Sequence, residues 1–310
     1  MISRKITGSR LWISLTAAGL ALTLAGCGPT ESTESTGAPE PSDRPEAASP
    51  DTNGVAAAPP PERPAWTEAS LHAAIKAVNP DYDGQGAFMI EGGRVVVAQL
   101  AAVAVQNLSP LKGEPLRGLD LSQSPVSDLS PIAGLPIMEL YLEQTRVEDI
   151  AALKGMPLVK LYLSQSGVTD LSPLTGAPIE ELNLLGTRVS DLSPLRGMPL
   201  RMLWLTECPV TDVSPIAECP LESLTLHRTQ VSDLRPLATS RLTRLHLGET
   251  PVTDLTPIRN LTLTRLIFDP RRIAQGLEIA RQMPTLQELG LTFEERTSPG
   301  VFWAQFPDLP

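Results

Sequence analysis

The sequence has few aromatic residues, few cysteines and few histidines, and no excess of positive charge. Its 310 residues include five Phe, four Trp, three Tyr, three Cys and three His. Three Cys cannot build a disulfide framework, and 42% hydrophobic residues with so few aromatics favour an aliphatic core made of small, similar units. The 25 Lys and Arg stand against 35 Asp and Glu, which argues against nucleic-acid binding because phosphates are neutralised by cations.

The amino terminus has the pattern of an export signal. Arg4, Lys5 and Arg10 precede an apolar run over residues 11–24, which is shorter than the roughly 20 residues of a transmembrane helix. The run Leu24 to Cys27 resembles the lipobox of bacterial lipoproteins. The resemblance implies a signal peptide over residues 1–26 and a diacylglycerol on the Cys27 thiol. We therefore expect an exported chain, lipid-anchored to a bacterial membrane, in the periplasm or at the cell surface. An uncleaved anchor with an incidental Cys is the alternative.

The segment that follows lacks the residues that build a core. Residues 28–64 are rich in Pro, Ser, Thr and Glu and contain no aromatic residue. Such a segment buries too little apolar surface to offset the entropy of ordering it. We predict a disordered tether over residues 27–65.

One repeat of 21 residues occupies most of the remaining chain. The pattern Leu-x-x-Leu-x-Leu begins at Leu116 and keeps this step to Leu263, with one further copy at Leu286. The tripeptide Val-x-Asp/Asn keeps the same step, at Val105, Val126, Val147, Val168, Val189, Val210, Val231 and Val252. This period is typical of leucine-rich repeats, in which stacked coils bury one continuous aliphatic core. The predicted fold is an α/β solenoid, a horseshoe with a parallel concave sheet and short 3-10 turns on the convex side.

The two ends are expected to carry caps. An amphipathic helix over residues 66–78 and a hairpin would form the amino-terminal cap, which with the first coil covers residues 66–115. Repeats would fill residues 116–270. A helix over residues 273–283 and the last strand would form the carboxy-terminal cap over residues 271–310, with Val301, Phe302, Trp303 and Phe306 covering the end of the core.

The repeated polar residues have structural explanations. Ser130 before Pro131 is expected to be the N-cap of a helical turn, and Asp128 to cap the bend through its carboxylate. The hydroxyls at Ser124 and at the equivalent Ser or Thr of later repeats should satisfy backbone groups inside the coil. Cys208 takes one of these buried positions and Cys219 a packing position, so we expect no disulfide between them.

The repeat Leu-x-x-Leu-x-Leu-x-x-Thr-x-Val-x-Asp-Leu-Ser-Pro-Leu resembles the bacterial leucine-rich repeats of the internalin type. The chain is also similar to the repeat domains fused to some bacterial membrane-bound Ser/Thr kinases. Those domains share the opening helix, an Asn-Pro-x-Tyr-Asp-Gly stretch (here residues 79–84), and a closing Phe-Trp (here residues 302–303). The resemblance covers residues 67–306 and implies the fold, whereas the sequence carries no kinase motif.

The concave face offers candidate binding residues. The outward-facing side chains that flank the leucines of the Leu-x-x-Leu-x-Leu pattern are acidic and aromatic in the first half of the repeats and basic towards the end. Exposed Tyr, Trp and Met are typical of binding hot spots, which favours a protein or peptide partner. Alternatively, the rings stack only to stabilise the sheet. The predicted partner-binding residues are Glu139, Tyr141, Glu143, Lys160, Tyr162, Leu185, Met202, Trp204, His227, Arg244 and His246.

Catalysis and metal binding have less support in the sequence. His227 and His246 would lie on adjacent coils near Glu207, Glu249 and Asp269, a set that could hold zinc. The open sheet face offers no deep site for it, and His72 is expected to face solvent on the first helix. We therefore predict a non-enzymatic protein without cofactor or metal. A structural or polysaccharide-binding envelope lipoprotein is the alternative function.

Overall fold

The computed structural model describes residues 65–309, which belong to one compact unit spanning Pro60–Pro310. The signal peptide, the lipidation at Cys27 and the tether up to residue 64 that the sequence predicts lie outside the described residues. A single hydrophobic core runs through the unit from Leu71 to Phe302. The repeats and both caps of this unit therefore share one continuous core. None of the helices in residues 65–309 has the length and apolar character needed to span a membrane.

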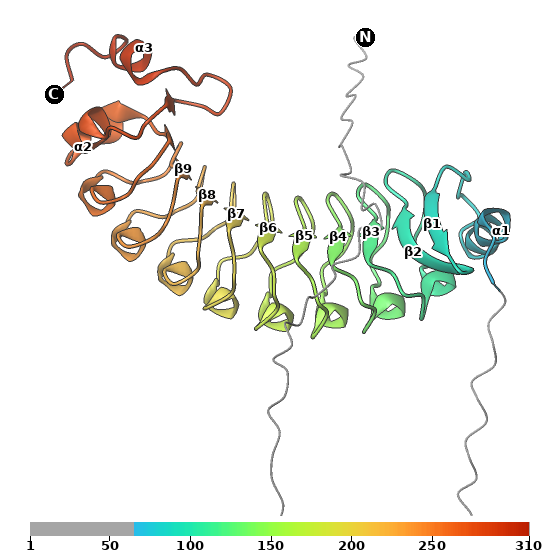
Figure 1. Cartoon of the computed structure of the whole chain (residues 1–310). Coiled ribbons are helices and arrows are strands. Elements are labelled where there is room, and N and C mark those ends of the chain that lie inside the picture. The colour runs from blue at the N-terminus through green and yellow to red at the C-terminus, as the bar shows by residue number, and fades with distance from the viewer. Residues whose placement is uncertain (1–64, 310) are drawn as a thin grey trace, which may run out of the picture. The chain divides into compact units, whose positions relative to one another are not determined.

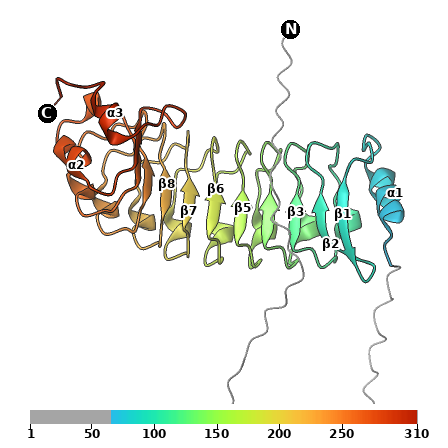
Figure 2. The same ribbon diagram turned by 45° about the horizontal axis from the view of Figure 1, so that its top comes forward.

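An open sheet of 11 strands follows the chain order from β1 to β11 and lines the concave side of an arc (Figures 1 and 2). β1 and β2 are antiparallel, and every later neighbour pairs in parallel. The strands are β1 Ala87–Glu91, β2 Arg94–Gln99, β3 Gly118–Asp120, β4 Glu139–Tyr141, β5 Lys160–Tyr162, β6 Glu181–Asn183, β7 Met202–Trp204, β8 Ser223–Thr225, β9 Arg244–His246, β10 Arg265–Ile267 and β11 Glu288–Gly290. The predicted leucine-rich-repeat solenoid is confirmed.

The register of the sheet follows from the leucine at the centre of each strand. Leu119 pairs with Leu140 and Leu140 with Leu161, so the 21-residue step of the sequence is the step from coil to coil. Between β10 and β11, Leu266 pairs with Leu289. The sequence step is longer there than 21 residues because the carboxy-terminal cap begins between these two strands. These leucines are at most 1% exposed. Alternating side chains of a strand point to opposite faces, so the residues on either side of each leucine face the concave surface.

Short 3-10 helices form the convex side (Figure 1). They span Ser109–Leu111, Ser130–Ile132, Ala151–Leu153, Ser172–Leu174, Ser193–Leu195, Ser214–Ile216, Arg235–Leu237, Thr256–Ile258 and Pro270–Arg272. The predicted N-cap role of Ser130 is wrong, because Ser130 is the first helical residue and Leu129 precedes it without a side-chain cap. Asp128 performs the capping instead, since its carboxylate accepts the Ser130 N–H at 2.8 Å and the Ser130 hydroxyl at 2.9 Å.

Buried hydroxyls close five of the bends as expected, at Ser124, Thr145, Thr187, Thr229 and Thr250, whereas the equivalent Ser166 hydroxyl is buried without a partner among the described residues. Ser124 donates to the Leu121 carbonyl at 2.6 Å, and Thr187 donates to the Leu184 carbonyl at 2.8 Å. Cys208 occupies the equivalent position one coil later, where its thiol donates to the same Leu184 carbonyl at 3.0 Å. Cys208 and Cys219 are both buried free thiols.

The amino-terminal cap is α1, Glu68–Val78, followed by the β1–β2 hairpin. Thr67 caps the helix by accepting the Ser70 N–H. Asn79 ends it and accepts the backbone N–H groups of Gln106 and Asn107, each at 2.8 Å. The expectation that His72 faces solvent is wrong: its ring lies against Phe88, and its Nδ1 is 2.8 Å from the Tyr82 hydroxyl.

The carboxy-terminal cap differs in detail from the prediction. The helix expected over residues 273–283 is only α2, Leu277–Gln282, because Gln275 forms a bridge with Asp254 and Gly276 has a left-handed φ of 77°. α3, Pro299–Trp303, then places Phe302 in the core, 5.9 Å from Phe268 between ring centroids. Val301 does not cover the core, since it is 55% exposed.

Candidate functional site

An aromatic cluster lies near the middle of the concave face. The Tyr141 and Tyr162 rings meet edge to face with centroids 5.1 Å apart, and Tyr162 lies 5.9 Å from Trp204. β5 and β7 are separated by β6, so Tyr162 and Trp204 lean towards each other across the strand that carries Asn183. All three side chains remain partly exposed. The cluster therefore presents ring surface to solvent.

Carboxylates hold these tyrosines in place. The Tyr162 hydroxyl donates to Glu181 at 3.0 Å, and the Tyr141 hydroxyl donates to Glu139 at 3.3 Å. Lys160 lies between the two glutamates, with its Nζ 3.7 Å from Glu139 and 3.6 Å from Glu181. Burial and the negative charge of Glu139 raise the pKa of Tyr141, so its hydroxyl stays protonated and keeps donating. Rings fixed before binding lose less entropy when a partner arrives.

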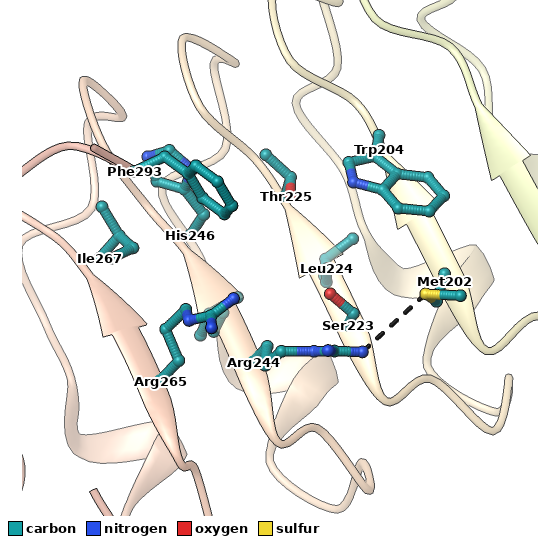
Figure 3. A pocket seen from close by; sticks show the side chains of 11 residues that line it. Met202, Trp204, Ser223, Leu224, Thr225, Arg244, His246, Arg265, Ile267 and Phe293 are labelled. Carbon is teal, nitrogen blue, oxygen red and sulfur yellow. Dashed lines mark hydrogen bonds between the residues drawn. The ribbon is translucent and has the colours of Figure 1, made fainter. Parts of the chain in front are cut away.

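A hollow of about 190 Å³ adjoins the aromatic cluster towards the carboxy-terminal end of the sheet (Figure 3). Its origin is the small outward side chains of β8, Ser223 and Thr225, which stand between larger residues on the neighbouring strands. Met202 and Trp204 of β7 form one wall, and Arg244 and His246 of β9 border the opposite side. Figure 3 shows the Trp204 ring and the Phe293 ring on opposite sides of the hollow.

Two nitrogen atoms at the hollow are buried without a hydrogen-bond partner among the described residues: Arg244 Nε and His246 Nε2. The Arg244 side chain crosses beside Ser223, and its Nη2 lies 3.9 Å from the Met202 sulfur, a weak acceptor (Figure 3). Burial, with a smaller contribution from His227, lowers the pKa of His246 to about 4. The imidazole is thus neutral at pH 7, and the positive charge at this side of the hollow belongs to Arg244.

His227, just beyond the end of β8, and His246, the last residue of β9, form a stacked pair. The His227 and His246 rings have centroids 4.9 Å apart and an interplanar angle of 28°. Gly248 leaves room for them, since a Cβ there would lie 2.8 Å from a nitrogen of each ring. Of the acids considered as their metal-binding partners, Glu207 binds Arg228 at 2.9 Å and Asp269 binds Arg271 at 2.8 Å. Glu249 lies 3.7 Å from His227 Nε2 but also binds Arg228 at 3.0 Å. Within residues 65–309, no group of three or more His, Cys, Asp or Glu side chains could hold a metal ion.

Comparison with solved structures shows which family the chain belongs to. A crystal structure of an internalin from Listeria monocytogenes (InlF) is 30% identical, with a TM-score of 0.57, over 72% of this chain and 68% of that one. The chain belongs to the internalin family of leucine-rich-repeat proteins. A second internalin, internalin C2 of Listeria monocytogenes, is 25% identical with a TM-score of 0.52, over 64% of this chain and 92% of that one. No protein-family model and no curated protein sequence matches the chain.

The structure of this internalin-family chain places all the predicted partner-binding residues along one face. Glu139, Tyr141, Lys160, Tyr162, Met202, Trp204, Arg244 and His246 lie in β4, β5, β7 and β9, and Glu143, Leu185 and His227 lie two residues beyond the strand ends. Eight of them fall into two groups. Glu139, Tyr141, Lys160 and Tyr162 belong with Trp204 to the aromatic cluster, and Met202, Trp204, Arg244 and His246 line the hollow, whereas Glu143, Leu185 and His227 belong to neither. Seven of the eleven residues that line the hollow were not predicted as binding residues: Ser223, Leu224, Thr225, Leu245, Arg265, Ile267 and Phe293.

Phe293 has no counterpart in the repeat. It lies in the irregular segment after β11, so the 21-residue period carries no signal for it. The guanidinium carbons of Arg265 and Arg296 lie 5.7 and 4.0 Å from its ring centroid. These cation–π contacts hold an otherwise half-exposed ring beside the hollow.

Proposed function

We propose that the concave face binds a protein or peptide partner without catalysis, with the aromatic cluster as its anchor. The observation that supports this most directly is the contact of Tyr141, Tyr162 and Trp204 on an open sheet, with the tyrosine hydroxyls held by glutamates. Binding hot spots are enriched in Tyr and Trp, and solenoids use their extended concave surfaces for binding. The internalin-type fold fits this function.

We further propose that the chain is exported and held at a membrane through lipid on Cys27. The sequence pattern before Cys27 supports export and lipidation. Lipidation of this residue with more than one acyl chain would be sufficient for stable membrane anchoring. Replacing the thiol tests it: Cys27→Ser should move the protein from the membrane fraction to the soluble exported fraction. A Cys27→Ser variant that remains with the membrane to the same extent would contradict the lipid anchor.

Partner binding is tested by comparing matched variants of the immobilised unit Pro60–Pro310. Detergent-solubilised envelope proteins are passed over the wild type, the double variant Tyr162→Ala with Trp204→Ala, and Lys154→Ala. Lys154 is an exposed residue on the convex side and serves as the control. Circular dichroism of each variant first establishes that the fold is retained.

The proposal expects one or a few proteins on the wild type and on Lys154→Ala that the double variant does not retain. Equal retention by all three forms would refute the aromatic cluster as the anchor. Retention of envelope polysaccharide, with no protein that depends on Tyr162 and Trp204, would favour the polysaccharide-binding alternative.

A further inference from the structure

The hollow beside Trp204 is too small for most ligands but has the size of a side-chain site. Its volume of about 190 Å³ is below the roughly 300–1,000 Å³ of typical small-molecule pockets. Its walls are the indole of Trp204, the thioether of Met202 and the ring of Phe293, and the almost fully buried Ile267 also borders it. This lining suits one large apolar side chain of a longer molecule.

The charge at the hollow differs from that of the rest of the concave face. Lys160 lies between Glu139 and Glu181, and Arg265 forms an ion pair with Glu288. Arg244 has no carboxylate of residues 65–309 within ion-pairing distance, and its only hydrogen-bond acceptor there is the Met202 sulfur. Its Nε is also buried without a partner. A guanidinium group binds best to an anion such as a carboxylate, which accepts two parallel hydrogen bonds from it. The partly buried Arg244 has no such anion among residues 65–309.

We propose that the hollow binds a peptide carboxylate through Arg244 and the adjacent large apolar side chain of the same peptide between Trp204 and Phe293. This inference rests on the proposed function and names the chemistry of the partner. The carboxylate belongs either to an acidic residue or to a free carboxy terminus, since both present the same two oxygens. Complementarity of charge to Arg244 and of volume to the apolar walls selects this occupant.

The proposal is tested by NMR titration of the unit Pro60–Pro310 with four short peptides at millimolar concentration. One pair carries Leu-Asp or Leu-Asn within a blocked Gly-Ser sequence. The other pair ends in Leu as a free acid or as an amide. The signals followed are the Arg244 Nε–H and the Trp204 indole N–H. The titration is repeated with Arg244→Met and with Arg241→Met, which removes the same charge from an exposed arginine three residues earlier.

At least one acid should bind about tenfold or more tightly than its amide, a difference of about 1.4 kcal/mol, because a charge-assisted hydrogen bond is stronger than a neutral one. This preference should disappear in Arg244→Met and persist in Arg241→Met. The pair that shows it identifies the source of the carboxylate.

Three results would overturn the proposal. They are equal affinities for acids and amides, an acid preference that Arg244→Met retains, and the absence of any shift at Arg244 and Trp204. If an oligomer of galacturonic acid shifts these signals and no peptide does, the ligand is an acidic polysaccharide and the peptide assignment is wrong. Retention of a protein that depends on Tyr162 but not on Arg244 would leave the proposed function standing while this inference fails.

Discussion

At the scale of single residues, the tight bends of each coil decide where glycine is needed. Gly155 follows the 3-10 helix Ala151–Leu153 with a φ of 74°, and a Cβ there would meet no atom within 4 Å. Gly155→Ala should therefore cost only backbone strain, about 1 kcal/mol of unfolding free energy. Urea denaturation measures this loss, and an unchanged midpoint would show that the bend tolerates a left-handed alanine. Non-glycine residues already adopt this conformation elsewhere, for example Gln144 with a φ of 56°.

His246 makes stability depend on pH. Its pKa is lowered to about 4 by burial, mainly, and by the neighbouring His227, while Glu294 acts in the opposite direction. Between its unfolded pKa near 6.5 and this folded value, the unfolded chain binds a proton that the folded chain does not. Stability is therefore complete above pH 6.5 and falls as the pH is lowered through this window. Allowing for partial exposure, we expect a loss on the order of 2 kcal/mol.

Denaturation curves at pH 7 and pH 5 for the wild type and His246→Gln measure this effect. The carboxylates with lowered pKa values start from ordinary values of 3.8 for Asp, as at Asp170, and 4.5 for Glu, as at Glu249, so their effect on stability lies mostly below pH 5 and is shared by both proteins. The variant should lose most of the pH dependence between these two conditions. An equal slope in both proteins would show that His246 is not the titrating group.

At the scale of elements, the leucine period was sufficient to predict the strands, their parallel register and the convex turns. Each coil buries the same set of leucine positions, so the structure predicted for one coil applies to all of them. The caps were harder, because they occur once. The helix expected over residues 273–283 loses its first turns to the bridge between Gln275 and Asp254, and His72 packs under the hairpin because Tyr82 and Phe88 surround it. Such tertiary contacts have no periodic signature.

Glu114 joins the amino-terminal cap to the first coil. This carboxylate is 1% exposed and accepts hydrogen bonds from Trp66 Nε1 at 3.1 Å, Arg94 Nε at 3.0 Å and the Val95 N–H at 3.0 Å. Glu114→Ala leaves these donors without their acceptor. The Val95 N–H stays buried, and a buried donor left unsatisfied costs roughly 1–3 kcal/mol, whereas the partly exposed Arg94 can be solvated. Thermal unfolding should show a large loss of stability, and hydrogen exchange should rise first in α1 and the hairpin. A loss below 1 kcal/mol, the scale of an exposed ion pair, would contradict this role.

At the scale of the whole molecule, function depends on what the regular sheet displays. The alternation of each strand was enough to predict which residues face the concave surface and that its aromatic side chains gather there. The hollow could not be predicted, because it depends on the absence of bulk at Ser223 and Thr225 and on Phe293, which arrives from outside the repeat. The charge on this face also divides along the solenoid, with carboxylates around the tyrosines and an uncompensated Arg244 further on.

The central claim, that the concave face binds a specific partner, is tested most directly by photo-crosslinking in the native cell. A photoreactive amino acid replaces Tyr162 in one strain and the exposed, convex Lys154 in another, and the adducts are identified by mass spectrometry. We expect one protein to be recovered from position 162 and to be absent from position 154. No adduct at position 162, or the same adducts from both positions, would contradict it.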